Sequence, residues 1–302
     1  MLFSSKKQLY FFLINPLLTT KDAMPELPEV ETIKNAIKKG IGCAKILDIE
    51  IRNRRLRDLI PDDMEHIVKN AKIINYERIA KYIVIHLDND FCIIWHMGMS
   101  GKVKISDEIN AIDKHDHIII KTSNGFLTYN DPRRFGLFTY CKKDEISKNK
   151  YLKNVGIDPF SKVIDAKYLY NNLQKKKSTL IKAALLDQTI IAGIGNIYAS
   201  EILYESRILP TRTCDKITLD ECNLIIENTK KVLQKAIDAG GSTLRDYKKP
   251  DGSLGYFQNM HCVYNKTGQK CPHCTCDIKT TGGIKSINIA GRSTFYCESL
   301  QK

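Results

Sequence analysis

The sequence predicts an α+β protein of several domains: an N-terminal β-sandwich behind one leading helix, a helical domain, and a small cysteine-rich hairpin at the C-terminus. Three observations support this order. One pattern at helical spacing is followed by many short runs rich in β-branched and aromatic residues. A second region carries apolar residues at helical spacing, and five of the ten cysteines crowd into the last segment. With 302 residues, 43% of them hydrophobic, the chain is long enough for about two or three domains.

The first domain is expected over residues 24–155. Its leading helix spans 28–39, because Val30, Ile33 and Ile37 recur at helical spacing and Gly40 stands where such a helix ends. The strands expected after it are residues 45–51, 72–76, 82–87, 91–95, 103–105, 117–121, 126–129 and 137–140. About eight short strands after one helix favour a β-sandwich.

The second domain, residues 156–245, is expected to be helical. Apolar spacing predicts helices at 180–186, 197–203 and 224–237, and Gly240-Gly241 closes the last of them. The third unit, residues 260–302, is short, polar and rich in cysteine, so it cannot bury a large core of its own.

Residues 1–23 stand outside this scheme. Lys6 and Lys7 precede a brief apolar stretch that Asn15-Pro16 interrupts. A signal peptide has a similar start, but this stretch is short and no clear small-residue cleavage site follows it. We expect either a leader that is removed or a start site assigned too far upstream.

The charge of the chain indicates its partner class. A net charge of +13 favours a polyanion, with nucleic acid first and an anionic membrane surface second. No apolar run approaches the roughly 20 residues that a membrane-spanning helix needs. Single scattered cysteines are typical of buried thiols in a reducing compartment such as the cytoplasm, and these are Cys43, Cys92, Cys141, Cys214 and Cys222.

The stretch beginning at Met24 reads MPELPEVE. Pro28 near the first turn and the acids beside it are ordinary helix-entry chemistry. Pro25 and Glu26 need another explanation. If Met24 were the true start and were removed, Pro25 would carry a free α-amine with a reference pKa of about 7.7–8.0. Such an amine is a nucleophile near neutral pH, and neighbouring carboxyl groups could move protons for it.

The terminal cysteines have the spacing of a metal site. Cys271 and Cys274 form one Cys-x2-Cys pair, but the second pair is broken, because Leu300 follows Cys297 where a cysteine would complete it. Four thiolates would hold zinc in a tetrahedral site. The fourth ligand is left open between Cys276, His273, Cys262 and water. A hairpin without metal, packed on the helical domain, is the alternative.

Four further motifs suit contact with DNA, although each has an ordinary structural explanation. Residues 131–136 join two arginines to a phenylalanine in a turn, and residues 96–101 place methionine between glycines, so both could enter a duplex. In residues 115–117 a histidine suits a phosphate contact or a buried hydrogen bond. Residues 193–198 suit a helix N-terminus that binds phosphate, with Lys177 and Lys182 upstream.

Together these motifs resemble the bacterial formamidopyrimidine-DNA glycosylase family (Fpg, or MutM). The resemblance runs from Met24 to Lys302 and includes, in family order, MPELPEVE, HMGMSG, DPRRFG, GIGNIYA and GRSTFYC. It implies an N-terminal β-sandwich, a helix–two-turns–helix DNA-binding domain and a C-terminal zinc finger with one zinc per chain. Leu300 departs from the family pattern at the fourth zinc cysteine, so Cys271, Cys274 and Cys297 are the metal ligands that remain.

The resemblance also implies roles for single residues. Pro25 matches the nucleophile that forms a Schiff base, and Glu26 matches the proton donor at the sugar. Lys81 and Arg292 match the donors for the first and second eliminations. Seven further positions match residues that contact DNA or that fill the gap left by a flipped nucleotide: His115, Arg133, Lys177, Met99, Phe135, Asn196 and Lys182. Residues 242–256 resemble the family's loop over the damaged base.

The expected function is therefore base-excision repair. The chain would remove oxidised purines from double-stranded DNA as a monomer in the bacterial cytoplasm, and would then cleave the strand by β- and δ-elimination. An enzyme of the endonuclease VIII branch, which prefers oxidised pyrimidines, is the nearest alternative. A DNA-binding protein without catalysis is the second alternative, and it applies if residues 1–23 stay attached to Pro25.

Overall fold

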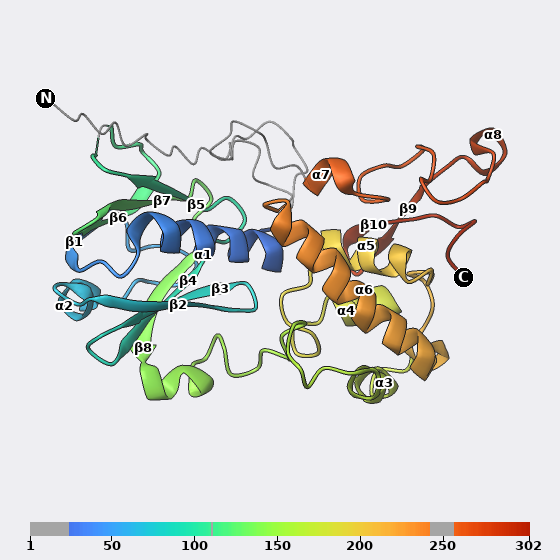
Figure 1. Cartoon of the computed structure of the whole chain (residues 1–302), viewed down its shortest axis with the longest axis horizontal. Helices are drawn as coiled ribbons and strands as arrows, with labels where there is room; N and C mark the ends of the chain where they lie inside the picture. Colours follow the sequence, from blue (N-terminus) through green and yellow to red (C-terminus); the bar gives the residue numbers. More distant parts are fainter. Residues whose placement is uncertain (1–23, 110, 242–256) are drawn as a thin grey trace, which may run out of the picture.

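The computed structural model describes residues 24–109, 111–241 and 257–302, and the expectations about residues 1–23 and 242–256 lie outside this part. A β-sandwich, a helical domain and a small hairpin follow one another along the molecule (Figure 1). Within these described ranges no helix is long and apolar enough to cross a membrane.

The sandwich consists of two antiparallel four-stranded sheets, as the sequence predicts. The first sheet has the order β1 (Ile46–Ile51), β6 (Asp116–Thr122), β7 (Gly125–Asn130) and β5 (Lys102–Ser106). The second has the order β2 (Ile73–Ile79), β3 (Tyr82–Leu87), β4 (Phe91–His96) and β8 (Leu137–Lys142). Trp95 fills the space between them, and its ring meets Tyr129 and Phe138 edge-on, each with 5.3 Å between ring centroids. A short helix that the sequence did not predict, α2 (Met64–Val68), follows β1.

Helix α1 (Leu27–Ile41) packs against strands of both sheets and also reaches the next domain. Its apolar stripe of Val30, Ile33 and Ile37 is buried in the sandwich core. Leu27, one turn earlier, belongs instead to the core of the helical domain. The first turn of α1 therefore stands at the junction between two hydrophobic cores.

The helical domain contains α3 (Ala166–Gln174), α4 (Ile181–Leu185), α5 (Asn196–Glu205) and α6 (Leu219–Asp238). Three of them match the helices expected from apolar spacing, and α3 was not predicted. Thr218 starts α6 with a reciprocal capping box. The Thr218 hydroxyl accepts from the Glu221 backbone N–H, and the Glu221 carboxylate accepts from the Thr218 backbone N–H. Helices α3 and α5 pack on α6 around one apolar core.

The C-terminal unit contains α7 (Phe257–Met260), α8 (Ile278–Thr281) and an antiparallel hairpin of β9 (Lys285–Ile289) and β10 (Arg292–Tyr296). Strand β10 packs on α5. A buried carboxylate on α5 fixes the start of this unit, because Glu201 accepts backbone N–H bonds of 2.7, 3.0 and 2.7 Å from residues 262, 263 and 264. Burial raises the pKa of Glu201.

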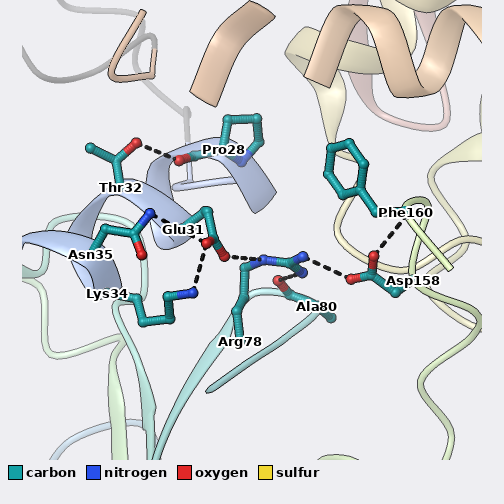
Figure 2. A network of polar contacts seen from close by, with 9 residues as sticks. All are labelled: Pro28, Glu31, Thr32, Lys34, Asn35, Arg78, Ala80, Asp158 and Phe160. Carbon is teal, nitrogen blue, oxygen red and sulfur yellow. Dashed lines mark hydrogen bonds and ion pairs between the residues drawn. The ribbon is translucent and has the colours of Figure 1, made fainter. Parts of the chain in front are cut away.

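An ion-pair network joins the sandwich to the segment that leads into the helical domain (Figure 2). The guanidinium of Arg78, at the end of β2, lies 2.9 Å from the carboxylate of Glu31 on α1 and 2.8 Å from that of Asp158. It also donates to the carbonyl of Ala80 at 3.2 Å. The Arg78 side chain is 8% exposed, so these interactions are largely shielded from solvent and fix the turn between β2 and β3.

Candidate active site and DNA interface

The centre of the candidate site is the carboxyl group of Glu26 at the N-terminus of α5. Its oxygens accept backbone N–H bonds from Gly195 at 2.7 Å, Ile197 at 2.9 Å and Tyr198 at 3.3 Å. The first turn of a helix presents such unpaired N–H groups, and an acidic side chain is a favourable partner for them. A residue of the N-terminal domain thus caps a helix of the second domain.

Two glycines make this close approach possible. A Cβ atom on Gly195 would lie 2.3 Å from the Glu26 carboxyl carbon, and one on Gly193 would lie 2.7 Å from the Leu27 Cβ. Gly193 also has a φ of +87°, which disfavours residues with a side chain. The backbone N–H of Leu27 donates to the Gly193 carbonyl at 3.1 Å. The glycines of the Gly-x-Gly motif therefore serve contact between domains.

This arrangement narrows the expectation that residues 193–198 bind phosphate with backbone N–H groups and Asn196, and the part that concerns Asn196 stays a prediction. The N–H groups of Gly195, Ile197 and Tyr198 are already used by Glu26, so they are not available to a phosphate. Sequence reasoning missed this because the competing carboxylate lies about 170 residues away in the chain.

Glu26 is suited to donate a proton at neutral pH. Burial raises the pKa of its carboxyl from 4.5 to about 7, and the positive charge of Lys81 and the backbone hydrogen bonds oppose that rise only in part. Proton donors work best when their pKa lies near the working pH. Glu29 holds the backbone in place, since its carboxylate accepts from the Glu26 N–H at 3.0 Å and from the Tyr198 hydroxyl at 2.6 Å. The sequence did not indicate that Glu29 would hold the backbone of Glu26.

Lys81 faces the same centre from the turn between β2 and β3. It is 6% exposed, and burial lowers the pKa of its ammonium group. The positive charge of Arg292 lowers this pKa further, whereas the negative charges of Glu26 and Glu29 raise it. The turn needs a positive φ of 53° at Ala80, whose carbonyl Arg78 holds. Three of the residues predicted as catalytic, Glu26, Lys81 and Arg292, are thus electrostatically coupled in one place. Pro25, the fourth, directly precedes Glu26 and is buried.

Lys182 is buried in the same region, and it joins the helical domain to the hairpin. Its ammonium group donates to the Asn196 side chain, to the Thr294 hydroxyl at 2.7 Å and to the Ser293 carbonyl at 3.4 Å. The Asn196 amide donates to the same carbonyl at 2.9 Å. Burial lowers the pKa of Lys182 to about 8. These bonds fix the strand that begins at Arg292.

The residues expected to fill a gap in DNA lie on two loops that are held together. Met99 is half-buried in one loop, while Phe135 is exposed in the other with the Arg133 guanidinium 4.7 Å from its ring centroid. Buried Asp131 connects them, because its carboxylate accepts from the Ser100 hydroxyl on the first loop. The same carboxylate accepts from the hydroxyl of Tyr129 at 3.1 Å and from the N–H of Gly136 at 2.8 Å.

The remaining predicted DNA contacts lie elsewhere on the surface. His115 is half-exposed, and its ring centroid is 6.2 Å from that of His117, whose ring bonds the Asp131 carbonyl at 2.9 Å. His117 therefore has the buried hydrogen bond that the sequence allowed as an alternative. Lys177 is exposed between α3 and α4.

The cysteine cluster can hold a metal ion. The sulfur atoms of Cys271, Cys274 and Cys297 lie within 4.8 Å of one another, while thiolates around one tetrahedral zinc are separated by about 3.8 Å. The three sulfurs are thus near the required positions. Cys274 is joined to Cys276 by a disulfide. Because a metal ligand must be a thiolate, that disulfide and ligation by Cys274 exclude each other.

Comparison with known proteins identifies the family. Residues 24–138 match the model of the formamidopyrimidine-DNA glycosylase N-terminal domain, and residues 155–248 match that of the formamidopyrimidine-DNA glycosylase H2TH domain. The chain belongs to the formamidopyrimidine-DNA glycosylase family. A family member from Zymomonas mobilis is 41% identical over 280 residues, which cover 92% of this chain and 100% of the relative. One from a Wolbachia of Brugia malayi is 40% identical over 279 residues, with the same coverage.

Solved structures of the family agree with this assignment. The Lactococcus lactis formamidopyrimidine-DNA glycosylase bound non-covalently to DNA with an AP site has a TM-score of 0.81 at 32% identity, covering 92% of this chain and 99% of that one. A mutant of the same enzyme, in complex with DNA containing Fapy-dG, has a TM-score of 0.82 at 33% identity and covers 92% and 100%. The three-part fold expected from the sequence is confirmed.

Proposed function

We propose that this glycosylase removes oxidised purines, 8-oxoguanine and formamidopyrimidines foremost, from double-stranded DNA and then cleaves the strand as an AP lyase. The relatives named as formamidopyrimidine-DNA glycosylases support the substrate class, as do the Lactococcus complexes with Fapy-dG and AP-site DNA. The observation that carries the proposal is the acid at the centre of the site, Glu26, whose pKa of about 7 suits proton donation beside Pro25 and Lys81.

In this reaction the amine of Pro25 attacks C1′ of the damaged nucleotide, and the bond to the base breaks. The base leaves with the bonding electron pair and takes up a proton. Glu26 donates a proton at the sugar, and the ring opens to a Schiff base on Pro25. The cationic imine makes the C2′ hydrogen acidic. A base takes up that proton, the C3′–O bond breaks, and the 3′ phosphate leaves with the bonding electron pair by β-elimination, with Lys81 as donor. Arg292 serves the second elimination, in which the 5′ phosphate leaves.

This chemistry requires Pro25 to have a free amine. Within a longer chain the proline nitrogen is a tertiary amide with no lone pair available for attack. The working enzyme therefore begins at Pro25, so residues 1–23 are either not translated or removed together with Met24. If they remained, the chain would bind DNA without forming the Schiff base.

DNA is bound across all three domains, which we place at residues 24–155, 156–245 and 260–302. Met99, Arg133 and Phe135 fill the gap that the flipped nucleotide leaves and offset an unstacking cost of a few kcal/mol. Their loops are held in advance by Asp131, which limits the entropy lost on binding. His115, Lys177 and Asn196 contact phosphates, and buried Lys182 belongs to the same set by holding the Asn196 side chain through a hydrogen bond.

The cysteine cluster binds one zinc ion, which stabilises the hairpin that carries Arg292. A unit of about 40 residues with a small core commonly depends on such a metal. Zinc supplies folding energy and no chemistry of the reaction. We further propose that the enzyme acts as a monomer in a reducing cytoplasm, where thiolate ligands persist.

Borohydride trapping tests the proposal directly. A protein beginning at Met24 should form a covalent adduct with a duplex containing 8-oxoguanine, and the Pro25→Gly change should remove most of it. The matched control is the same protein with residues 1–23 retained and uncleaved, which should bind the duplex without trapping. Absence of an adduct with the Met24 protein would contradict the enzyme proposal. Faster turnover of thymine glycol than of 8-oxoguanine would favour the endonuclease VIII branch.

A further inference from the structure

The metal cluster lacks one ligand where the second cysteine pair is broken. Leu300 packs against the apolar cluster that contains Cys271 and Cys297, and it cannot ligate. The local turn is nonetheless kept, because the Leu300 N–H donates to the Cys297 carbonyl at 3.1 Å. Structural zinc sites are almost always closed by four protein ligands. A closed site therefore needs a donor from elsewhere, an inference that rests on the zinc proposed above.

Two of the candidate donors make other contacts in the structure. The His273 ring is exposed and stacks on Tyr204, with 5.6 Å between ring centroids. The Cys262 thiol lies 3.6 Å from the Glu205 carboxylate, and its backbone N–H is bound by Glu201 at 2.7 Å. The cluster of close donor atoms contains Cys271, Cys274 and Cys297, so none of the three candidates belongs to it as the structure stands.

Cys276 is placed differently. It is half-buried, its Cα is 5.5 Å from that of Cys274, and its sulfur directly contacts the Cys274 sulfur in their disulfide. The Cys274 sulfur in turn lies within 4.8 Å of those of Cys271 and Cys297. The Cys276 side chain thus already extends to the edge of the metal site, and reduction of the disulfide frees its sulfur to act as a ligand.

We propose that Cys276 supplies the fourth thiolate, so that zinc is held by Cys271, Cys274, Cys276 and Cys297. Three ligands then come from one loop, and one comes from the residue that follows β10. The site requires the reduced protein. A dithiol converts the disulfide into the two thiols by giving up two electrons and two protons, and is itself oxidised to a disulfide. Zinc binding then displaces the thiol protons.

Zinc content of purified variants is the first test. After reduction and dialysis against a weak chelator, the wild-type chain should retain one zinc, and Cys276→Ser should lose most of it. Cys262→Ser is the matched control, a half-buried cysteine of the same unit, and it should retain zinc. Adding Leu300→Cys to Cys276→Ser should restore zinc, because the turn after Cys297 still holds that position beside the cluster.

The wild-type chain provides a second test that does not depend on how the variants fold. With cobalt in place of zinc, the sulfur-to-metal charge-transfer band should indicate four thiolates, and cobalt should protect Cys276 from alkylation together with the other three cysteines. The role of Cys276 would be overturned by a spectrum that indicates three thiolates, or by alkylation of Cys276 at the same rate as in the apoprotein. Either result would still be consistent with a metal site at the other three cysteines. A reduced wild-type chain without zinc would overturn both, while the glycosylase proposal is decided separately by borohydride trapping.

Discussion

Replacing Glu26 with glutamine should change the pH dependence of base release in a way that identifies the proton donor. In the wild-type enzyme the Pro25 amine must be deprotonated, with a reference pKa of about 7.7–8.0. Glu26 must be protonated, and its pKa is about 7. The rate should therefore peak between these two values and fall about tenfold per pH unit on the alkaline side. Glu26→Gln should lower the peak rate by about 10²–10⁴ and remove the alkaline limb.

The same pKa makes a prediction about stability. Because the pKa is raised in the folded state, from 4.5 to about 7, folding favours the protonated acid. This contribution is fully present below pH 4.5 and is lost as the pH rises through about 7. The shift corresponds to about 3 kcal/mol of unfolding free energy, of which about 2–3 kcal/mol should be lost between pH 5 and pH 8. Glutamine removes that dependence but has one acceptor oxygen for three N–H donors, so its stability at pH 5 should be about 1–3 kcal/mol lower.

Single-turnover base release from an 8-oxoguanine duplex, measured from pH 5.5 to 9 with protein beginning at Met24, tests the rate, and urea unfolding at the same pH values tests stability. The matched control is Glu201→Gln, because Glu201 is also a buried glutamate that accepts three backbone N–H bonds. It should cost similar stability and leave the alkaline limb in place. If Glu26→Gln keeps a wild-type alkaline limb, Glu26 is not the acid, and the reasoning is refuted.

Three other changes test the neighbouring parts of the site. Lys81→Met removes the charge that lowers the pKa of Glu26, so the alkaline limb of base release should move to higher pH, and cleavage of a preformed AP site should slow. Asp131→Ala leaves buried donors without an acceptor, so urea unfolding should show a loss of about 1–3 kcal/mol, and affinity should fall more for a lesion duplex than for an intact one. Arg78→Met removes the ion pairs with Glu31 and Asp158, although Glu31 keeps its ion pair with Lys34, and should lower stability by about 1–3 kcal/mol in low salt. Lys150→Met, at an exposed ion pair, should have a smaller effect.

The sequence predicted the elements of the fold well because their patterns are local. Each expected strand of the sandwich is present, with ends that differ by up to three residues, as for β2 at Ile73–Ile79. Helix α1 was predicted from Val30, Ile33 and Ile37, which are all buried. The unpredicted helix α2 is five residues long and carries too few apolar positions to show a period.

The site was only partly predictable, because its chemistry depends on contacts between distant residues. Glu26 was found through its motif, yet its raised pKa comes from burial against α5, about 170 residues along the chain. Asp131 and Arg78 were not singled out individually, since nothing in their neighbours shows that they bridge two loops or two domains. Lys81, unremarkable in composition, was found by the resemblance alone. Spacing cannot indicate which side chains a long-range contact will bury.

Because the pKa of Glu26 is raised to about 7 by burial between two domains, the proposed proton donor is a product of their docking. A separate sandwich domain would expose that carboxyl group to water and return it to an ordinary acid, ionised at neutral pH and unable to give up a proton. The residues of the sandwich that we propose as catalytic thus cannot work as an independent module. Any event that separates the sandwich from the helical domain would therefore stop base release, even if the residues that touch the lesion kept their positions.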